Sequence, residues 1–284
     1  MTDWFELDGV PFGAGAPWGV AEWDRGSRTL VTQDVVLQAR DGRVFGRDRE
    51  DGPEWTFMLR PSDVDGGELL AELARLRTAW EGPRGSLLDE AVLRYATGGR
   101  TRRVFGRPRR FAEASAPHER EAGLADVQAT FQLSDPLHYD DEESSIDLGI
   151  VPASSALLRF PTAPPFRWTS EGGQTVRGAV VGGDAPTPVT IRFHGPVARP
   201  WVRIGGVVVQ VFGDLAWDQQ LVVDARRLLI TRGDGAPWPG MLSPTTRMAD
   251  LRLAPGTHGV TFGGTDLTGT SRVEVAWRDA WRSL

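Results

Sequence analysis

Apolar and polar residues alternate along much of this chain with the period of two that is typical of half-buried β-strands. The clearest case runs from Ala125 to Leu133, where every second residue is apolar, and Pro136 follows it as a residue that cannot donate to a strand ladder. The pair Gly98–Gly99 predicts a hairpin turn between two further strands. Strands are also predicted in the opening stretch and at residues 29–39, 54–60, 86–97 and 101–111.

One segment has the helical period instead. Within residues 66–80, apolar side chains recur at spacings of three and four, and Asp63 or Asp65 precedes them as a candidate cap. The predicted apolar face consists of Leu69, Leu70, Leu73, Leu76 and Trp80. The first half is therefore expected to be a β-sandwich or barrel covered by one helix.

A change of composition divides the chain. Between residues 140 and 175 the alternation gives way to acids, Ser, Pro and Gly, a mixture typical of a connector. Short alternating strands then follow at turn spacings of about 8–12 residues, as in β-sandwiches and jelly rolls. These are expected within residues 188–195, 200–213, 219–235, 249–264 and 271–281. The sequence thus predicts a mainly β protein of two domains, residues 1–150 and 151–284.

Composition narrows the possible functions. The net charge of -6 argues against a general nucleic-acid binder, which needs surplus cations to displace counterions from phosphates. The absence of Cys excludes disulfides, thiolate metal sites and a Cys nucleophile. The N-terminal stretch does not resemble a secretory signal, and no apolar run reaches the roughly 18 residues that a membrane helix requires. A soluble protein without membrane insertion is expected.

The stretch DPLHYDDEESS, after the strand that ends at Leu133, is the first candidate for chemistry. His138 lies among Asp135, Asp140 and Asp141, but His118, His194 and His258 are distant and have no metal-ligand spacing. We therefore interpret it as a solvated loop. Asp214, Asp218 and Asp224 are candidates for a glycosidase pair only in the sense that carboxylates are present. No nucleophile elbow, P-loop or dinucleotide fingerprint occurs, so no catalytic residue, metal or cofactor is predicted.

Two further features allow alternative interpretations. Tryptophan is frequent, with 11 copies, and Trp201, Trp217 and Trp238 lie near turns where an indole can stack on a sugar, anchor a partner or simply pack in a core. Residues 100–110 contain a dense run of Arg, which fits either a solvated hairpin face paired with acids or an interface with an acidic or phosphate-bearing partner.

The order of these elements resembles the distal tail protein family of long-tailed, non-contractile bacteriophages. The resemblance covers nearly the whole chain and is strongest at the strand that leads into Asp135–Pro136 with Tyr139. The other matching stretches are WFELDGVPFG, LRFPTAPPFRW, VTIRFHGPVARPWVRI, LVVDARRLLI and VEVAWRDAW. It implies an N-terminal ring-forming domain, a C-terminal galectin-like sandwich, and a structural role without enzymatic activity.

The same resemblance implies the partners and the location. Members of the family form a ring, usually a hexamer, that joins the end of the tail tube to the baseplate or tail tip. The expected partners are further copies of the chain, the tail tube protein, the tail tip or tail-associated protein and the tape measure protein. Genome DNA would only pass through the channel. The protein would be located in the virion tail tip, and in the host cytoplasm during assembly.

Residues 39–55 are the candidate ring contact. This stretch is too long and polar for a tight turn, yet it carries Val44 and Phe45 at its centre, which would have no core to enter if it projected as a hairpin. A neighbouring subunit would then cover Arg43, Val44, Phe45 and Arg47. Alternatively, the loop folds back on its own domain. A carbohydrate-binding module or host-cell adhesin, using the tryptophans of the second half, is the alternative function.

Overall fold

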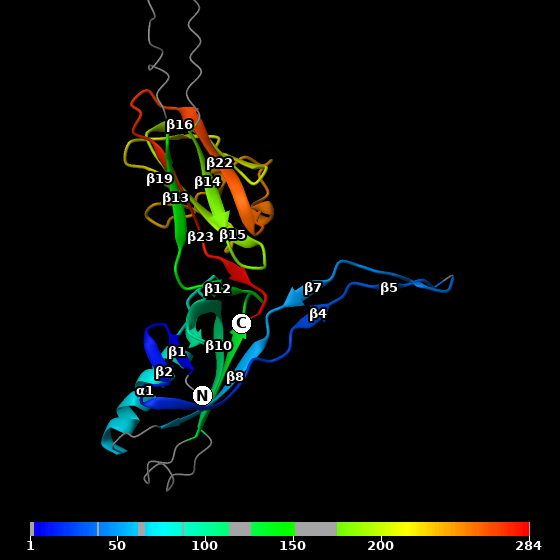
Figure 1. The fold of residues 1–284 in the computed structure, drawn as a ribbon, viewed down its shortest axis with the longest axis vertical. Helices are drawn as coiled ribbons and strands as arrows, with labels where there is room; N and C mark the ends of the chain where they lie inside the picture. The colour runs from blue at the N-terminus through cyan, green and yellow to red at the C-terminus, as the bar shows by residue number, and fades with distance from the viewer. Residues whose placement is uncertain are drawn as a thin grey trace, which may run out of the picture. The chain divides into compact units, whose positions relative to one another are not determined.

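The computed structural model describes residues 3–38, 40–61, 66–86, 88–113, 126–150 and 175–283. These residues form two compact units, Met1–Asp141 with Trp281–Leu284 and Glu142–Ala280. The described residues form mainly β-strands and one α-helix (Figure 1), which confirms the fold class that the alternation predicts. No helix in the described part of the chain is long and apolar enough to cross a membrane.

An antiparallel sheet forms most of the first unit. Its strands lie in the order β2-β1-β9-β10-β11-β8-β3, and the short strand β12 (His138–Asp140) pairs with β10 and with β24 (Ala280–Trp281). The strands are β1 (Trp4–Leu7), β2 (Val10–Gly13), β3 (Trp18–Asp24), β8 (Glu54–Pro61), β9 (Ala91–Thr97), β10 (Arg100–Glu113) and β11 (Val127–Leu133). Thr97 pairs with Arg100 across Gly98 and Gly99, both of positive φ, so the predicted hairpin is confirmed.

The helix α1 (Gly66–Glu81) matches the predicted segment. Leu73, Leu76 and Trp80 are buried, and the indole Nε1 of Trp80 donates to the carbonyl oxygen of Thr130 at 2.9 Å. Leu70 was wrongly assigned to this face, because it is 63% exposed. At about 100° per residue it lies roughly 120° around the helix from Leu76. The side chain of Leu69 and the proposed caps lie outside the described residues.

Aromatic rings fill the core of the first unit. Phe57 lies at the centre of this cluster, fully buried, on the inner face of β8. Its ring centroid is 5.2–6.3 Å from those of Phe5, Phe12, Trp55, Trp80 and Trp23. Ring pairs at such distances contribute stabilising free energy beyond that gained from removing their apolar area from water. Most of the tryptophans in this unit therefore serve packing.

The second unit is a sandwich of two antiparallel sheets. One, here called sheet D, has the order β13-β23-β15-β19-β20, and β21 also pairs with β15; the other, sheet E, has the order β14-β22-β16-β17, and β18 also pairs with β16. Sheet D contains β13 (Ser144–Gly149), β15 (Thr187–His194), β19 (Gln220–Asp224), β20 (Leu229–Arg232), β21 (Arg252–Leu253) and β23 (Arg272–Trp277). Sheet E contains β14 (Thr175–Val181), β16 (Val197–Ile204), β17 (Val207–Gln210), β18 (Asp214–Leu215) and β22 (Gly256–Thr265). Two short 3-10 helices, Pro239–Met241 and Met248–Asp250, complete the unit.

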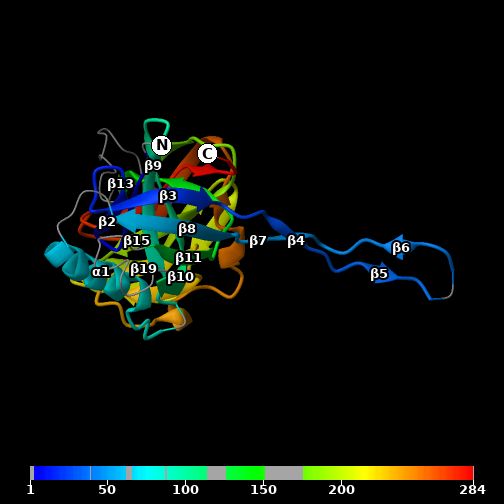
Figure 2. The same cartoon turned by 90° about the horizontal axis from the view of Figure 1, so that it is seen from below.

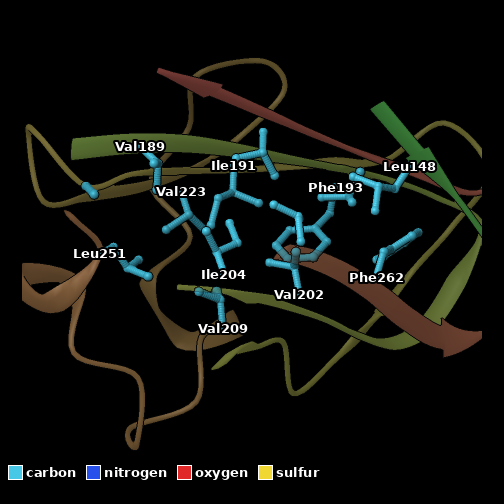
Figure 3. Close-up of a cluster of buried hydrophobic side chains, with 14 of the residues drawn as sticks. Leu148, Val189, Ile191, Phe193, Val202, Ile204, Val209, Val223, Leu251 and Phe262 are labelled. Carbon is cyan, nitrogen blue, oxygen red and sulfur yellow. The ribbon is translucent and has the colours of Figure 1, made fainter. Parts of the chain in front are cut away.

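The core between these sheets is mainly aliphatic. Figure 3 shows Val, Ile and Leu side chains from both sheets interdigitating around Phe193 and Phe262. β13 pairs with β23 and belongs to this unit, whereas the boundary predicted at residue 150 placed it in the first domain. The alternating pattern of β13 is short and follows the acidic run directly, so composition hid it. The rest of the predicted connector, residues 151–174, lies outside the described residues.

The packing of Phe57 gives a direct test of the first core. We expect Phe57→Ala to lower the free energy of unfolding by about 3–5 kcal/mol, because the cavity would be lined by rings that cannot collapse into it. Leu70→Ala, on the exposed side of α1, should change it by no more than about 0.5 kcal/mol. Urea unfolding followed by tryptophan fluorescence measures both. Equal effects of the two substitutions would contradict this core.

Candidate assembly arm

A β-ribbon extends from the ends of β3 and β8, and Figure 2 shows it reaching away from the sheet of its own unit. We call residues 29–51 the arm. It contains the pairs β4 (Thr29–Val31) with β7 (Arg49–Asp51) and β5 (Val35–Val36) with β6 (Arg43–Val44). The sequence predicted one long strand at 29–39, but the structure has two short strands there that pair only within the arm.

The arm is held at its base and at its middle. At the base, the side-chain amide of Gln132 donates to the carbonyl oxygen of Gly52 at 2.6 Å, and the backbone N–H of Leu133 donates to that of Pro53 at 3.1 Å. A Cβ on Gly52 would collide with the carbonyl oxygen of Leu133, so this close approach requires glycine. At the middle, Asp34 accepts from the backbone N–H of Gly46 at 3.1 Å and pairs with Arg43. Hydrogen bonds and an ion pair thus hold the two strands of the ribbon at its base and at its middle.

Apolar side chains of the arm have no cover within the described chain. Phe45 is 80% exposed, and five more large apolar residues are close to or above half exposure: Leu30, Val31, Val35, Val36 and Val44. They are concentrated on the strand that runs outward, while the returning strand carries Arg and acidic residues. A two-stranded ribbon cannot bury such a surface by itself. The alternative that this loop folds back on its own domain is not what the structure shows.

The four residues predicted for the interface lie together on the returning strand of the arm, at and just after β6. Val44 and Phe45 are exposed, Arg43 is partly engaged by Asp34, and Arg47 is exposed. The structure adds Leu30, Val31, Val35 and Val36, which sequence reasoning assigned to an ordinary strand. The signal that was available is their pattern, since Val35 and Val36 are adjacent and do not alternate.

The acidic stretch after β11 is structural. Asp141 accepts from Arg94 and Arg103, with the shortest N–O distance 2.6 Å in each pair, and Asp140 accepts from the indole of Trp281 at 2.9 Å. Asp135 accepts from the backbone N–H of Leu137 at 3.0 Å, which closes the turn after β11. Hydrogen bonding to Arg94 holds the pKa of Asp141 below its ordinary value, as does Arg103, against the opposing effect of burial. The acids therefore neutralise the Arg residues of β9 and β10.

The prediction of a solvated loop at His138 was wrong. His138 is buried on β12, its Nδ1 lies 2.7 Å from the hydroxyl of Tyr95, and its ring packs near that of Trp55. Burial raises the pKa of Tyr95. The strand β12 could not be recognised from the sequence, because it is too short to show alternation and polar residues surround His138. No group of three or more His, Asp or Glu residues that could hold a metal occurs in the described ranges.

The Arg run of β10 is largely engaged inside its own unit. Arg102 is buried, donates to the carbonyl oxygen of Ser283 at 2.6 Å and lies 4.7 Å from the ring of Trp281. Arg103 binds Asp141, and Arg107 donates to backbone carbonyl oxygens of Ser86 and Asp89. Arg109 and Arg110 are exposed. The interpretation as a solvated hairpin face paired with acids describes Arg103, whereas Arg102 is buried and Arg107 binds backbone carbonyl oxygens.

The candidate residues of the second unit do not form one site. Trp201 is partly buried against Gly263, Trp217 is 69% exposed between β18 and β19, and Trp238 packs against the core and Arg232. No pair of these rings is in contact in the described structure. Asp214 accepts from the backbone N–H of Arg199 on the paired strand β16, Asp224 accepts from the backbone N–H of Arg226 in the turn that follows it, and Asp218 is exposed. Neither a sugar platform nor a carboxylate pair is assembled by these contacts.

Comparison with known proteins locates the fold. No family model and no curated protein matches this chain. Among solved structures, the SPP1 Dit (gp 19.1) protein, described as a paradigm of hub adsorption apparatus in phages that infect Gram-positive bacteria, is 14% identical, with a TM-score of 0.58 over 99% of both chains. A chain of the phage P2 baseplate in its activated conformation with Ca is 10% identical, with a TM-score of 0.56 over 100% of both chains. The same baseplate with Sr gives 9% identity and a TM-score of 0.55, over 97% of this chain and 98% of the other. The fold of this protein is thus that of phage hub and baseplate proteins along its whole length.

The ion pairs of Asp141 predict a dependence of stability on pH. The pKa of this carboxyl is lower in the folded than in the unfolded chain, so its contribution is complete above the ordinary value of 3.8 and is lost as the pH falls through the folded value. We expect Asp141→Asn to lower the free energy of unfolding by about 2 kcal/mol at pH 7, and the difference from the wild type to shrink below about pH 4.

The matched control is Asp126→Asn. Asp126 pairs with Arg60 at 2.8 Å on the surface, where an ion pair contributes about 0–1 kcal/mol. Urea unfolding at a series of pH values measures both variants. A loss for Asp141→Asn that does not change between pH 7 and pH 3 would show that charge is not the cause.

Proposed function

We propose that this chain is a distal tail protein, a structural hub that forms a ring joining the end of a phage tail tube to the baseplate or tail tip. The observation that carries the proposal is the match of the whole chain, both units included, to phage hub and baseplate structures. The arm supports it independently, because its exposed apolar side chains fit an assembled state. No enzymatic role is proposed.

The arm is the proposed contact between neighbouring subunits. The six large apolar side chains of the arm are between about half and four-fifths exposed, so only that part of each remains to be buried. At about 1.5–3 kcal/mol for burying a fully exposed side chain, covering them with a neighbour would contribute roughly 5–10 kcal/mol before the entropic cost of association. Contact areas of permanent assemblies usually exceed about 2,000 Å². A projecting ribbon adds such area without enlarging the domain behind it. The contact is heterologous, since one subunit supplies the arm and the next a different surface.

The first unit would build the ring, and the sandwich of the second unit would lie outside it. Six copies are the number implied by the family. The proposed partners are the tail tube protein, the tail tip or tail-associated protein and the tape measure protein, and DNA passes through the channel. The proposed location is the tail tip of the virion, after assembly in the host cytoplasm.

A double substitution on the returning strand of the arm tests the proposal. We expect Val44→Asp with Phe45→Asp to shift the mass measured by light scattering from ring to monomer at micromolar concentration, because two carboxylates would have to enter an apolar contact. Circular dichroism should be unchanged, since neither side chain enters a core. Leu70→Asp, equally solvent-facing but on α1, is the control and should leave the ring intact.

Two outcomes would overturn separate parts of the proposal. Rings formed by the double variant at micromolar concentration would show that the arm does not hold neighbouring subunits together through Val44 and Phe45. A wild-type chain that stays monomeric under all conditions, including in the presence of its tail tube protein, would refute the hub function itself.

A further inference from the structure

The two outer faces of the sandwich differ in chemistry. On sheet D, the outward row Asp147–Glu274–Arg192 is charged, and Arg192 donates to Glu274 at 2.9 Å. The β14, β22, β16 and β17 strands of sheet E contain three Arg and no acidic residue. Their outward positions are mostly Val, Thr and Gly, and Val176 and Val180 are 64% and 70% exposed. Sheet E therefore presents an apolar face where its partner sheet presents a solvated one.

Two glycines leave a shallow trough in this face. Gly178 and Gly259 are paired across β14 and β22, between the pairs Val176–Thr261 and Val180–Thr257. Neither has a positive φ, and a Cβ on Gly259 would meet no described atom within 4 Å. Glycine in the middle of a strand costs stability relative to a β-branched residue, and it often marks the close approach of another chain. Nothing in the described part of this unit requires glycine at Gly259.

The chain itself supplies an occupant for this face. Apart from isolated side chains, the exposed large apolar residues in the described part of the chain fall into two groups, the arm and the surface of sheet E with its neighbouring Phe212. The arm is a β-ribbon that carries Phe45, an aromatic side chain without cover, on its returning strand just after β6. Sheet E has a shallow trough where the Gly178–Gly259 pair has no side chains. When two β-surfaces pack face to face, their side chains interdigitate, so a large ring on one surface fits where the other lacks side chains. The returning strand of the arm carries Asp48 among its charged residues, and Arg203 is exposed on sheet E.

We propose that the outer face of sheet E, around Gly178, Gly259, Val176 and Val180, is the surface that receives the arm of a neighbouring copy of this chain, with Phe45 seated over the glycine pair. This inference rests on the proposed function and identifies the surface that the arm contacts on the neighbouring copy. It also assigns a role to the second unit, which holds the neighbour's arm as well as facing outward.

Absence of Cys from the chain permits a direct cross-linking test. Phe45→Cys and Gly259→Cys are made in separate chains of different tagged length and mixed before mild oxidation. A disulfide forms only where the two Cβ atoms come within about 4.5 Å. We expect a heterodimer on a non-reducing gel. Phe45→Cys mixed with Asp147→Cys, on the exposed face of sheet D, is the control and should give none.

A second variant separates docking from folding. Gly259→Val should raise the melting temperature of the monomer, because Val is the better strand residue and its side chain meets open space. The same substitution should weaken ring formation about tenfold or more, because it fills the trough. A glycine with only a structural role would not give these opposite effects.

Light scattering on the same mixtures distinguishes the two levels of the proposal. Rings that form without the heterodimer, or with equal cross-linking to Asp147→Cys, overturn the assignment of this face and leave the hub intact. A disulfide that forms only when both cysteines are in one chain would place the arm on its own sandwich and also overturn it. Monomers in every mixture would refute the proposed function from which it starts.

Discussion

The end of β11 is the constraint on which both outward connections of the first unit depend. At Gln132 and Leu133 this strand binds the backbone of Gly52 and Pro53, where the arm returns to the sheet. Only two residues later Asp135 closes the turn that leads to β12 and the acidic run. One strand therefore sets where the arm leaves and where the chain leaves for the second unit. A substitution that moved Leu133 would disturb both, although neither contains it.

Charge has a similar double use in this molecule. All of its cations apart from histidine are Arg, whose planar fork binds a carboxylate through two parallel bonds. Arg94 uses this geometry on both carboxylate oxygens of Asp141, while Arg103 donates to Oδ1 and to the backbone carbonyl oxygen of the same residue. Arg102 is buried beside the ring of Trp281. The acidic residues that resemble a ligand cluster in the sequence form these internal ion pairs and hydrogen bonds. Their abundance carries no information about catalysis once the partners are visible.

The sequence predicted well where one period dominates a segment. The strands around Phe131, the helix through Leu76 and Trp80, and the turn at Gly98–Gly99 all follow from local patterns. It failed where partners are distant, because burial of His138 depends on Tyr95 and Trp55, which are far away in the chain. The arm was half predicted. Phe45 lies among polar residues, which indicates exposure. Leu30 and Val31 belong to an apolar run like that of a core strand, and they differ only because no second sheet covers them.

If each copy carries both an apolar arm and an apolar face that accepts one, the contact is directional, and its geometry decides what is built. An open row of copies always leaves one arm and one face in water at its two ends. Closing the row buries both and gains a further contact without ordering another subunit in solution, so a ring is favoured over shorter rows once the rotation between neighbours permits closure. The rotation depends on how the arm is held at its base. The hydrogen bonds between Gln132 and Gly52 and between Gly46 and Asp34 would thus connect the local geometry of one ribbon to the number of copies in the proposed ring.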